Sequence, residues 1–115
     1  MNLNEIARVL ELELLTPGIA LDADVKAGYV SDLLSDVLAN APRGGLLVTV
    51  QVHLNVIAVA VHAELAGVIF AGGRMPDETV RKKAAEEGIA LLVSRESAFE
   101  VVGRLYGLGL RGRPA

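Results

Sequence analysis

Three polar residues alternate near the middle of the chain, where an apolar segment ends. Gln51, His53 and Asn55 follow the β-branched run 46–50 and precede an alanine-rich run. In open parallel sheets, ligands bind beyond the carboxyl ends of the strands. These three residues are therefore candidates for contacting a ligand. A histidine with no acid or nucleophile nearby in the sequence is more often a hydrogen-bonded residue than a catalyst, so both roles stay open.

A second candidate is the segment 69–78, IFAGGRMPDE, in which an apolar run leads into two glycines, an arginine and a helix start. Free N–H groups at Gly72 and Gly73 would bind an anion at the positive end of that helix, and Arg74 would add a bidentate contact. Two acidic residues already place negative charge on the same helix start, and the spacing matches neither GxxxxGK[ST] nor GxGxxG. The segment predicts either a tight turn or an anion site, and not a P-loop.

Ser31 begins a third group, directly after a predicted strand over residues 25–30. Asp32 and Asp36 lie one helical turn apart, a spacing that would hold a metal ion or a shared proton. Alternatively, Ser31 caps a helix that continues to about residue 39, and both acids lie on its solvated face. The inward face of that helix is then predicted to consist of Leu33, Leu34, Val37 and Leu38. In either case Ser31 would face the same crevice as the other candidates.

The composition limits the possible functions. The chain has 115 residues, no cysteine, a net charge of -3 and only four aromatic residues, two Phe and two Tyr. Such a chain forms one domain without disulfides, and it lacks the basic clusters and stacking aromatics of nucleic-acid-binding proteins. His53 and His62 match no common zinc spacing, so we assign no metal and no cofactor. We identify no signal peptide and expect a cytoplasmic location.

The hydrophobic content is 52%, which is high for a small domain and predicts self-association. Residues 44–63 contain no Asp, Glu, Lys or Arg, and a membrane span has this length. Three polar residues near the centre would be costly in a bilayer, so we prefer a buried strand followed by a buried helix. Because the part 56–63 is apolar nearly all round, we expect a second subunit to cover its outer side and form a dimer.

The remaining pattern predicts an α/β domain with a parallel or mostly parallel sheet and helices on both faces. The predicted helices cover residues 4–10, 31–39, 55–64, 76–87 and 97–108, and the predicted strands cover 25–30, 46–52, 66–70 and 89–93. Ser97 and Glu100 fit a capping box. Ala98, Val101, Val102, Leu105 and Tyr106 are predicted to form the inward face of the last helix. Residues 1–110 form the expected domain, and 111–115 are expected to be a disordered tail.

With this order of elements, the chain resembles a DRTGG domain. This small α/β module occurs alone, in phosphotransacetylases, and next to CBS domains in some pyrophosphatases, and it is similar to the N-terminal domain of HPr kinase/phosphorylase. The resemblance rests on the segments 28–36 (GYVSDLLSD), 65–69 (LAGVI), 71–73 (AGG) followed by Pro76, and 98–100 (AFE). The threonine of the family's Thr-Gly-Gly is Ala71 here, and its Asp-Arg pair is absent near His53-Leu54.

The resemblance implies a noncatalytic, often dimeric module that accompanies regulatory or metabolic enzymes. We therefore expect a homodimer that binds a nucleotide or another small anionic metabolite, a partner metabolic enzyme, or both. The expected ligand-binding residues are Ser31, Gln51, His53, Asn55, Gly72, Gly73 and Arg74. One alternative is a pure interaction domain without ligand. The other is a small phosphotransfer or hydrolytic enzyme, for which the sequence offers no evident nucleophile–base pair.

Overall fold

A five-stranded sheet forms the centre of the protein in the computed structural model, which describes residues 1–114. The strand order is β1-β5-β4-β3-β2. The strands are β1 (Glu13–Leu14), β2 (Ala27–Val30), β3 (Gly45–Thr49), β4 (Gly67–Phe70) and β5 (Leu91–Val93). Strands β2 to β5 pair in parallel, and β1 adds an antiparallel edge to β5. The predicted, mostly parallel sheet is confirmed, whereas β1 was not predicted.

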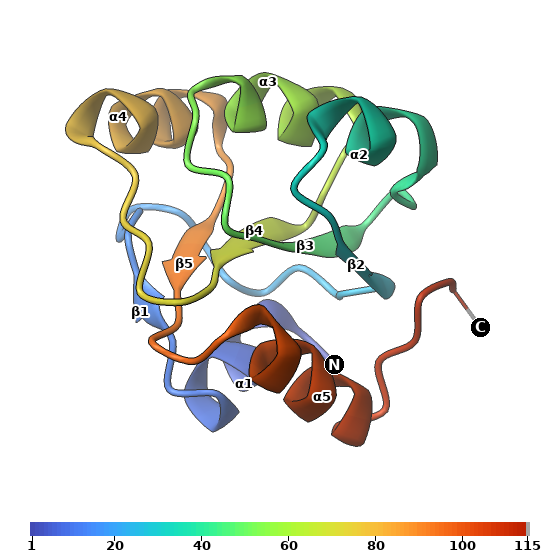
Figure 1. The fold of residues 1–115 in the computed structure, drawn as a ribbon. Coiled ribbons are helices and arrows are strands. Elements are labelled where there is room, and N and C mark those ends of the chain that lie inside the picture. The colour runs from blue at the N-terminus through green and yellow to red at the C-terminus, as the bar shows by residue number, and fades with distance from the viewer. Residues whose placement is uncertain (115) are drawn as a thin grey trace.

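Helices cover both faces of this sheet, as predicted (Figure 1). Helices α2 (Leu34–Asn40), α3 (Asn55–His62) and α4 (Glu78–Glu87) lie on one face. Helices α1 (Leu3–Val9) and α5 (Ala98–Gly107) lie on the other face. The chain changes faces after β5, since the crossovers from β2 to β5 all use the first face. No helix of residues 1–114 is long and apolar enough to cross a membrane.

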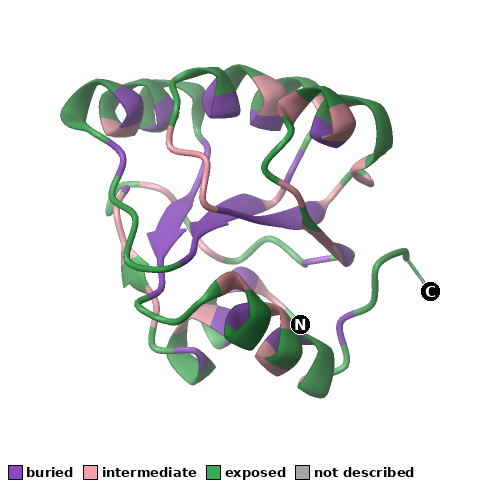
Figure 2. Cartoon of the chain, in the orientation of Figure 1, coloured by how far each residue is buried: buried purple, intermediate pink, exposed green. Residues whose placement is uncertain are grey.

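The central strands are buried (Figure 2). Their side chains alternate between two apolar clusters, one on each face of the sheet. Leu46, Val48 and Ile69 join the cluster beneath α1 and α5. Leu47 and Phe70 join the cluster beneath α2, α3 and α4. This two-sided burial explains why the strand sequences are continuous apolar runs instead of alternating patterns.

Two helices, α5 and α4, begin at side-chain caps. Ser97 Oγ accepts a hydrogen bond from the Glu100 N–H, as the predicted capping box requires of the serine. Asp77 Oδ1 accepts one from the Val80 N–H, which makes Asp77 the N-cap of α4. The prediction that this helix begins at Pro76 was therefore wrong by two residues, because the side chain of Asp77 supplies the cap.

Helix α2 begins later than predicted, at Leu34, and its N-cap position is Leu33 instead of Ser31. The backbone at Leu33 is extended, since the preceding Asp32 carboxylate is tied to the end of β3. Leu33 therefore lies before the helix and is 65% exposed, and Leu38 is also exposed, against the prediction. Val9 of α1 is likewise exposed.

Helix α3 is buried against the sheet on one side only. Val56, Ile57 and Ala60 face the core, whereas Ala58 and Val61 are exposed. The expected second buried side is therefore open in the single chain.

The chain stays attached to the sheet beyond α5. Leu110 is buried in the cluster beneath α1 and α5, and the carbonyl of Arg111 accepts a 2.8 Å hydrogen bond from the Gly28 N–H. This contact partly covers the outer edge of β2, the last strand of the sheet. The segment 111–115, which we expected to be a disordered tail, begins at Arg111. Its last residue, 115, lies outside the described residues.

Candidate functional site

The predicted ligand-binding residues all follow neighbouring parallel strands at one edge of the sheet. Ser31 follows β2, the group Gln51, His53 and Asn55 follows β3, and Gly72 begins the loop after β4. Because parallel strands end at the same edge, the chain brings these loops to one side of the molecule. The hydrogen bonds within this edge decide which groups remain available to a ligand.

Asp32 joins the loops after β2 and β3. Its Oδ1 accepts hydrogen bonds from the Thr49 hydroxyl at 2.9 Å and from the Val50 N–H at 2.8 Å. Ser31 bonds within its own loop, where its Oγ accepts from the Leu33 N–H at 3.2 Å. The loop after β2 is thus held by Asp32, a role that the sequence did not reveal. Ser31 supplies a local turn instead of the predicted cap.

The three polar residues after β3 form a series of local hydrogen bonds. Gln51 Oε1 accepts from the His53 N–H at 3.2 Å, and His53 Nδ1 accepts from the Asn55 N–H at 3.0 Å. An imidazole that accepts at Nδ1 carries its proton on Nε2. His53 and Asn55 are exposed, so this loop can offer a ligand the Nε2–H of His53 and the side-chain amide of Asn55 as donors.

The two glycines after β4 use their N–H groups inside the protein. Both have φ near +69°, and their N–H groups donate to the carbonyls of Glu96 and Ser94 at 2.7 Å. These bonds join the loop after β4 to the loop after β5. The segment IFAGGRMPDE is therefore a tight turn whose glycine N–H groups are engaged by a neighbouring loop.

Arg74 is the remaining group of this turn that is suited to an anion. Its side chain is exposed and forms no hydrogen bond or ion pair with residues 1–114. Its N–H donates to the Ala71 carbonyl at 3.3 Å, which closes the turn. An anion at this edge would therefore bind through side chains, chiefly the guanidinium of Arg74 and the Nε2–H of His53.

The two carboxylates considered for a metal or a shared proton have separate partners. Asp36 accepts hydrogen bonds from Asn40 Nδ2 at 2.9 Å and from the Tyr29 hydroxyl at 2.8 Å. These donors, Asn40 first, lower the pKa of Asp36, and the same contact with Asp36 raises the pKa of Tyr29. Asp32 is bound to the β3 loop instead. Within the described residues, no group of three or more His, Asp or Glu is placed to hold a metal ion.

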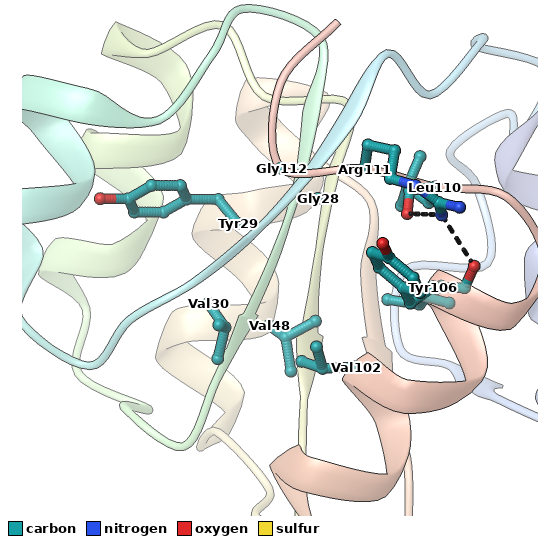
Figure 3. Close-up of a pocket in the computed structure, with 10 residues that line it drawn as sticks. Gly28, Tyr29, Val30, Val48, Val102, Tyr106, Leu110, Arg111 and Gly112 are labelled. Atoms are coloured by element: carbon teal, nitrogen blue, oxygen red, sulfur yellow. Dashed lines mark hydrogen bonds between the residues drawn. The ribbon is translucent and has the colours of Figure 1, made fainter.

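The hollows of the surface lie elsewhere. An apolar groove of about 150 Å³ runs between β2 and α5, and it is lined by Val30, Val48, Val102, Tyr106 and Leu110 among others (Figure 3). A second apolar hollow of about 410 Å³ continues along α5 over Phe99 and Gly103. None of the seven predicted site residues lines either of these hollows.

A third groove, of about 450 Å³, is polar and lies between β1 and α5. It contains Arg95, Arg104, Glu11 and Glu13. Arg104 already donates to Glu96 Oε1 and to the Val9 carbonyl. Because Glu11, Glu13 and Glu96 lie among these arginines, the groove has no preference for an anion.

The sequence prediction missed the apolar groove because it placed Tyr106 on the inward face of α5. In the structure Tyr106 is 59% exposed and Phe99 is 78% exposed. The sequence does contain a signal for this groove. Phe99 and Tyr106 lie in the first and third turns of the predicted helix 97–108, on the same side of it.

No model of a known family matches this chain, and no curated protein matches it either. The solved structures do include a similar fold. Residues covering 95% of this chain match the regulatory region of Clostridium perfringens pyrophosphatase, which contains CBS and DRTGG domains and was crystallised with its activator, diadenosine tetraphosphate. The TM-score is 0.70 at 15% sequence identity, and the match covers 47% of that chain. This protein therefore has the fold of about half of a pyrophosphatase regulatory region.

Proposed function

We propose that this chain is a noncatalytic regulatory domain of the DRTGG type, which binds a nucleotide or another small phosphorylated metabolite and acts as a homodimer. The observation that carries the proposal is the match of 95% of the chain to a regulatory region that binds a dinucleotide activator. The enzyme that it regulates would be a separate partner, and the setting would be the cytoplasm.

The proposed ligand site is the carboxyl edge of β2, β3 and β4. Arg74 would hold the phosphate through a charge-assisted contact, and His53 would donate from Nε2. Ser31, Gln51 and Asn55 would orient the remainder of the ligand. Gly72 and Gly73 would contribute a close approach without a side chain, since their N–H groups already bond to the β5–α5 loop.

Thermal unfolding in the presence of diadenosine tetraphosphate, ATP and a panel of sugar phosphates tests this proposal. A ligand at a hundredfold excess over its Kd stabilises the folded state by about 2.7 kcal/mol. For a domain of this size, that corresponds to a rise in Tm of roughly 10 °C. Arg74→Ala and His53→Ala should each weaken binding about ten- to hundredfold, because each removes one charged or hydrogen-bonded contact.

The matched control is Arg43→Ala, which removes one exposed arginine from the loop before β3, at the opposite edge of the sheet. That variant should keep the full rise in Tm. A panel without any rise, or a rise that survives Arg74→Ala unchanged, would overturn the proposed site. Turnover of any phosphorylated compound in the panel would instead favour the enzymatic alternative.

A further inference from the structure

The strand β2 and the helix α5 present a continuous apolar surface to solvent. We call it the β2–α5 surface and define it by Val30, Ala98, Phe99, Val102, Gly103 and Tyr106. Val30 is 52% exposed, and the two aromatic residues are exposed still further. Large exposed apolar patches on small domains mark interaction sites. Burial of Phe99 and Tyr106 would remove the two largest exposed apolar side chains of this surface from water.

The groove in this surface has a fixed wall. The guanidinium of Arg111 stacks on the ring of Tyr106 at 3.7 Å from its centroid, and Nη1 of Arg111 donates to the carbonyls of Tyr106 and Leu110 at 3.0 Å (Figure 3). A cation held over an aromatic ring in this way limits the rotation of both side chains. Val30 and Val102 line the same groove. The surface is therefore preorganised for a rigid partner, which reduces the entropic cost of binding.

Gly103 stands in the middle of α5, where glycine is unfavourable. A Cβ at this position would meet nothing within 4 Å, so the single chain has room for a side chain. Glycine in a helix interior destabilises the helix relative to alanine. A close approach of another backbone at this point would use the missing side chain, because small residues let two helices come together.

A second copy of the chain fits this surface better than an unrelated partner. The protruding ring of Phe99 and the hollow over Gly103 lie on the same surface, and a twofold interface requires such self-complementarity. The charges agree as well. Glu100 lies in the first turn of α5, and Arg111 and Arg113 follow its last turn. In an antiparallel pair of α5 helices, the acidic end of one copy meets the basic end of its partner.

We propose that two copies associate through the β2–α5 surface, with their α5 helices antiparallel and crossing near Gly103. This inference rests on the self-association in the proposed function and specifies where it occurs. A specific interface takes about 800 Å² from each partner, which is about an eighth of the 6207 Å² exposed by one chain. The β2–α5 surface supplies the central aromatic anchors that such interfaces use.

The outer side of α3, which the sequence suggested as the interface, offers less. Its hollow is lined by Ala58, Val61 and His62 together with Lys83 and Glu87, which form an ion pair. Interface centres are depleted of charged residues and enriched in aromatic ones. The outer side of α3 is therefore the alternative interface, and the experiment must distinguish it from the β2–α5 surface.

Sedimentation velocity over a range of protein concentrations tests the inference. The wild type should be dimeric at about 100 μM, since specific interfaces of standard size have Kd values from micromolar downward. Phe99→Asp should raise the dissociation constant at least about thirtyfold, as expected for the loss of a central anchor. The matched control is Val61→Asp, which adds the same charge to an exposed apolar position of α3 and should leave the dimer intact.

Both side chains are exposed, so the variants should keep the wild-type circular dichroism and unfold cooperatively. A monomeric wild type at about 100 μM, a dimer that survives Phe99→Asp, or a dimer broken by Val61→Asp would each overturn the inference. Arg74→Ala separates this result from the ligand proposal, because it should reduce nucleotide stabilisation and still sediment as a dimer. A dimer without any nucleotide response would therefore refute the ligand site alone.

Discussion

Helices α3 and α5 each turn one face to the sheet and the other to solvent, but their outer faces differ in shape. The outer face of α3 carries small aliphatic side chains, Ala58 and Val61, beside charged residues of α4. The outer face of α5 carries Phe99 and Tyr106 around a bare stretch of backbone at Gly103. Apolar content alone would select α3, whereas a protruding ring beside a hollow selects α5. The proposed interface therefore rests on the shape of this surface and not on apolar content alone.

The two faces of β2 show the same contrast on a smaller scale. Tyr29 points away from the groove, toward α2, and its hydroxyl is bound by Asp36 (Figure 3). Val30, the next residue, lies in the groove beside α5 and is half exposed. The α2 side of this strand is thus completed within the chain. The α5 side is left open within the described residues, where Val30 stays half exposed.

Replacing Gly103 in α5 by alanine should change both the stability of the monomer and its association, and it is the larger of the two effects predicted from this comparison. Gly103→Ala should raise the free energy of unfolding of the monomer by about 0.5–1 kcal/mol, because alanine favours the helix. The same Cβ should weaken association about tenfold, since it overpacks the proposed crossing. Urea unfolding of dilute protein and sedimentation velocity of concentrated protein measure the two quantities.

The matched control is the opposite substitution, Ala58→Gly, on the exposed side of α3. It should lower the free energy of unfolding by about 0.5–1 kcal/mol and leave association unchanged. Opposite signs for stability and association in Gly103→Ala would be hard to obtain from a purely structural role. The comparison fails if Gly103→Ala associates as tightly as the wild type, or if Ala58→Gly weakens the dimer.

A smaller effect is expected at the completed side of β2. The pKa of Asp36 is lowered from 3.8 by hydrogen bonds from Asn40 and Tyr29, so its ionised form stabilises the folded state above pH 3.8. This contribution is lost as the pH falls from 3.8 through the lower folded-state pKa. Tyr29→Phe should lower the Tm at pH 7 by a few degrees at most. The difference from the wild type should shrink as the solution is acidified below pH 3.8.

Thermal scans of Tyr29→Phe and wild type between neutral and acidic pH measure this effect. The variant should remain a dimer, because Tyr29 points away from the β2–α5 surface. A Tm difference that is constant across the acidic range would show that the effect of Tyr29 does not depend on the ionised form of Asp36. Loss of the dimer would show that both sides of β2 serve the interface.

The parallel strands could be predicted because buried strands and the helices between them leave distinct apolar patterns. Strand β1 could not, since Glu13 and Leu14 are too few residues to show a period. The inward face of α5 was partly misjudged for a physical reason. Beyond β2 the sheet has no further strand, so Val101 and Leu105 are covered while Tyr106 extends past the edge.

The positions of the candidate site residues followed from strand order, but their hydrogen bonds did not. The Gly72 and Gly73 N–H groups bond to carbonyls more than twenty residues away in sequence, at Ser94 and Glu96. Asp32, which follows β2, likewise accepts a hydrogen bond from Thr49 at the end of β3. Such contacts depend on how loops settle after the sheet forms, and a single sequence carries no period or motif for them.

Amide hydrogen exchange at two protein concentrations tests the central claim most directly. Contacts made on association raise the free energy of local opening and slow exchange where they form. Between dilute and concentrated protein, protection should increase at Val30 and along α5, and it should stay unchanged along α3. An increase confined to α3, or no change anywhere with concentration, would contradict the assignment of the β2–α5 surface as the interface.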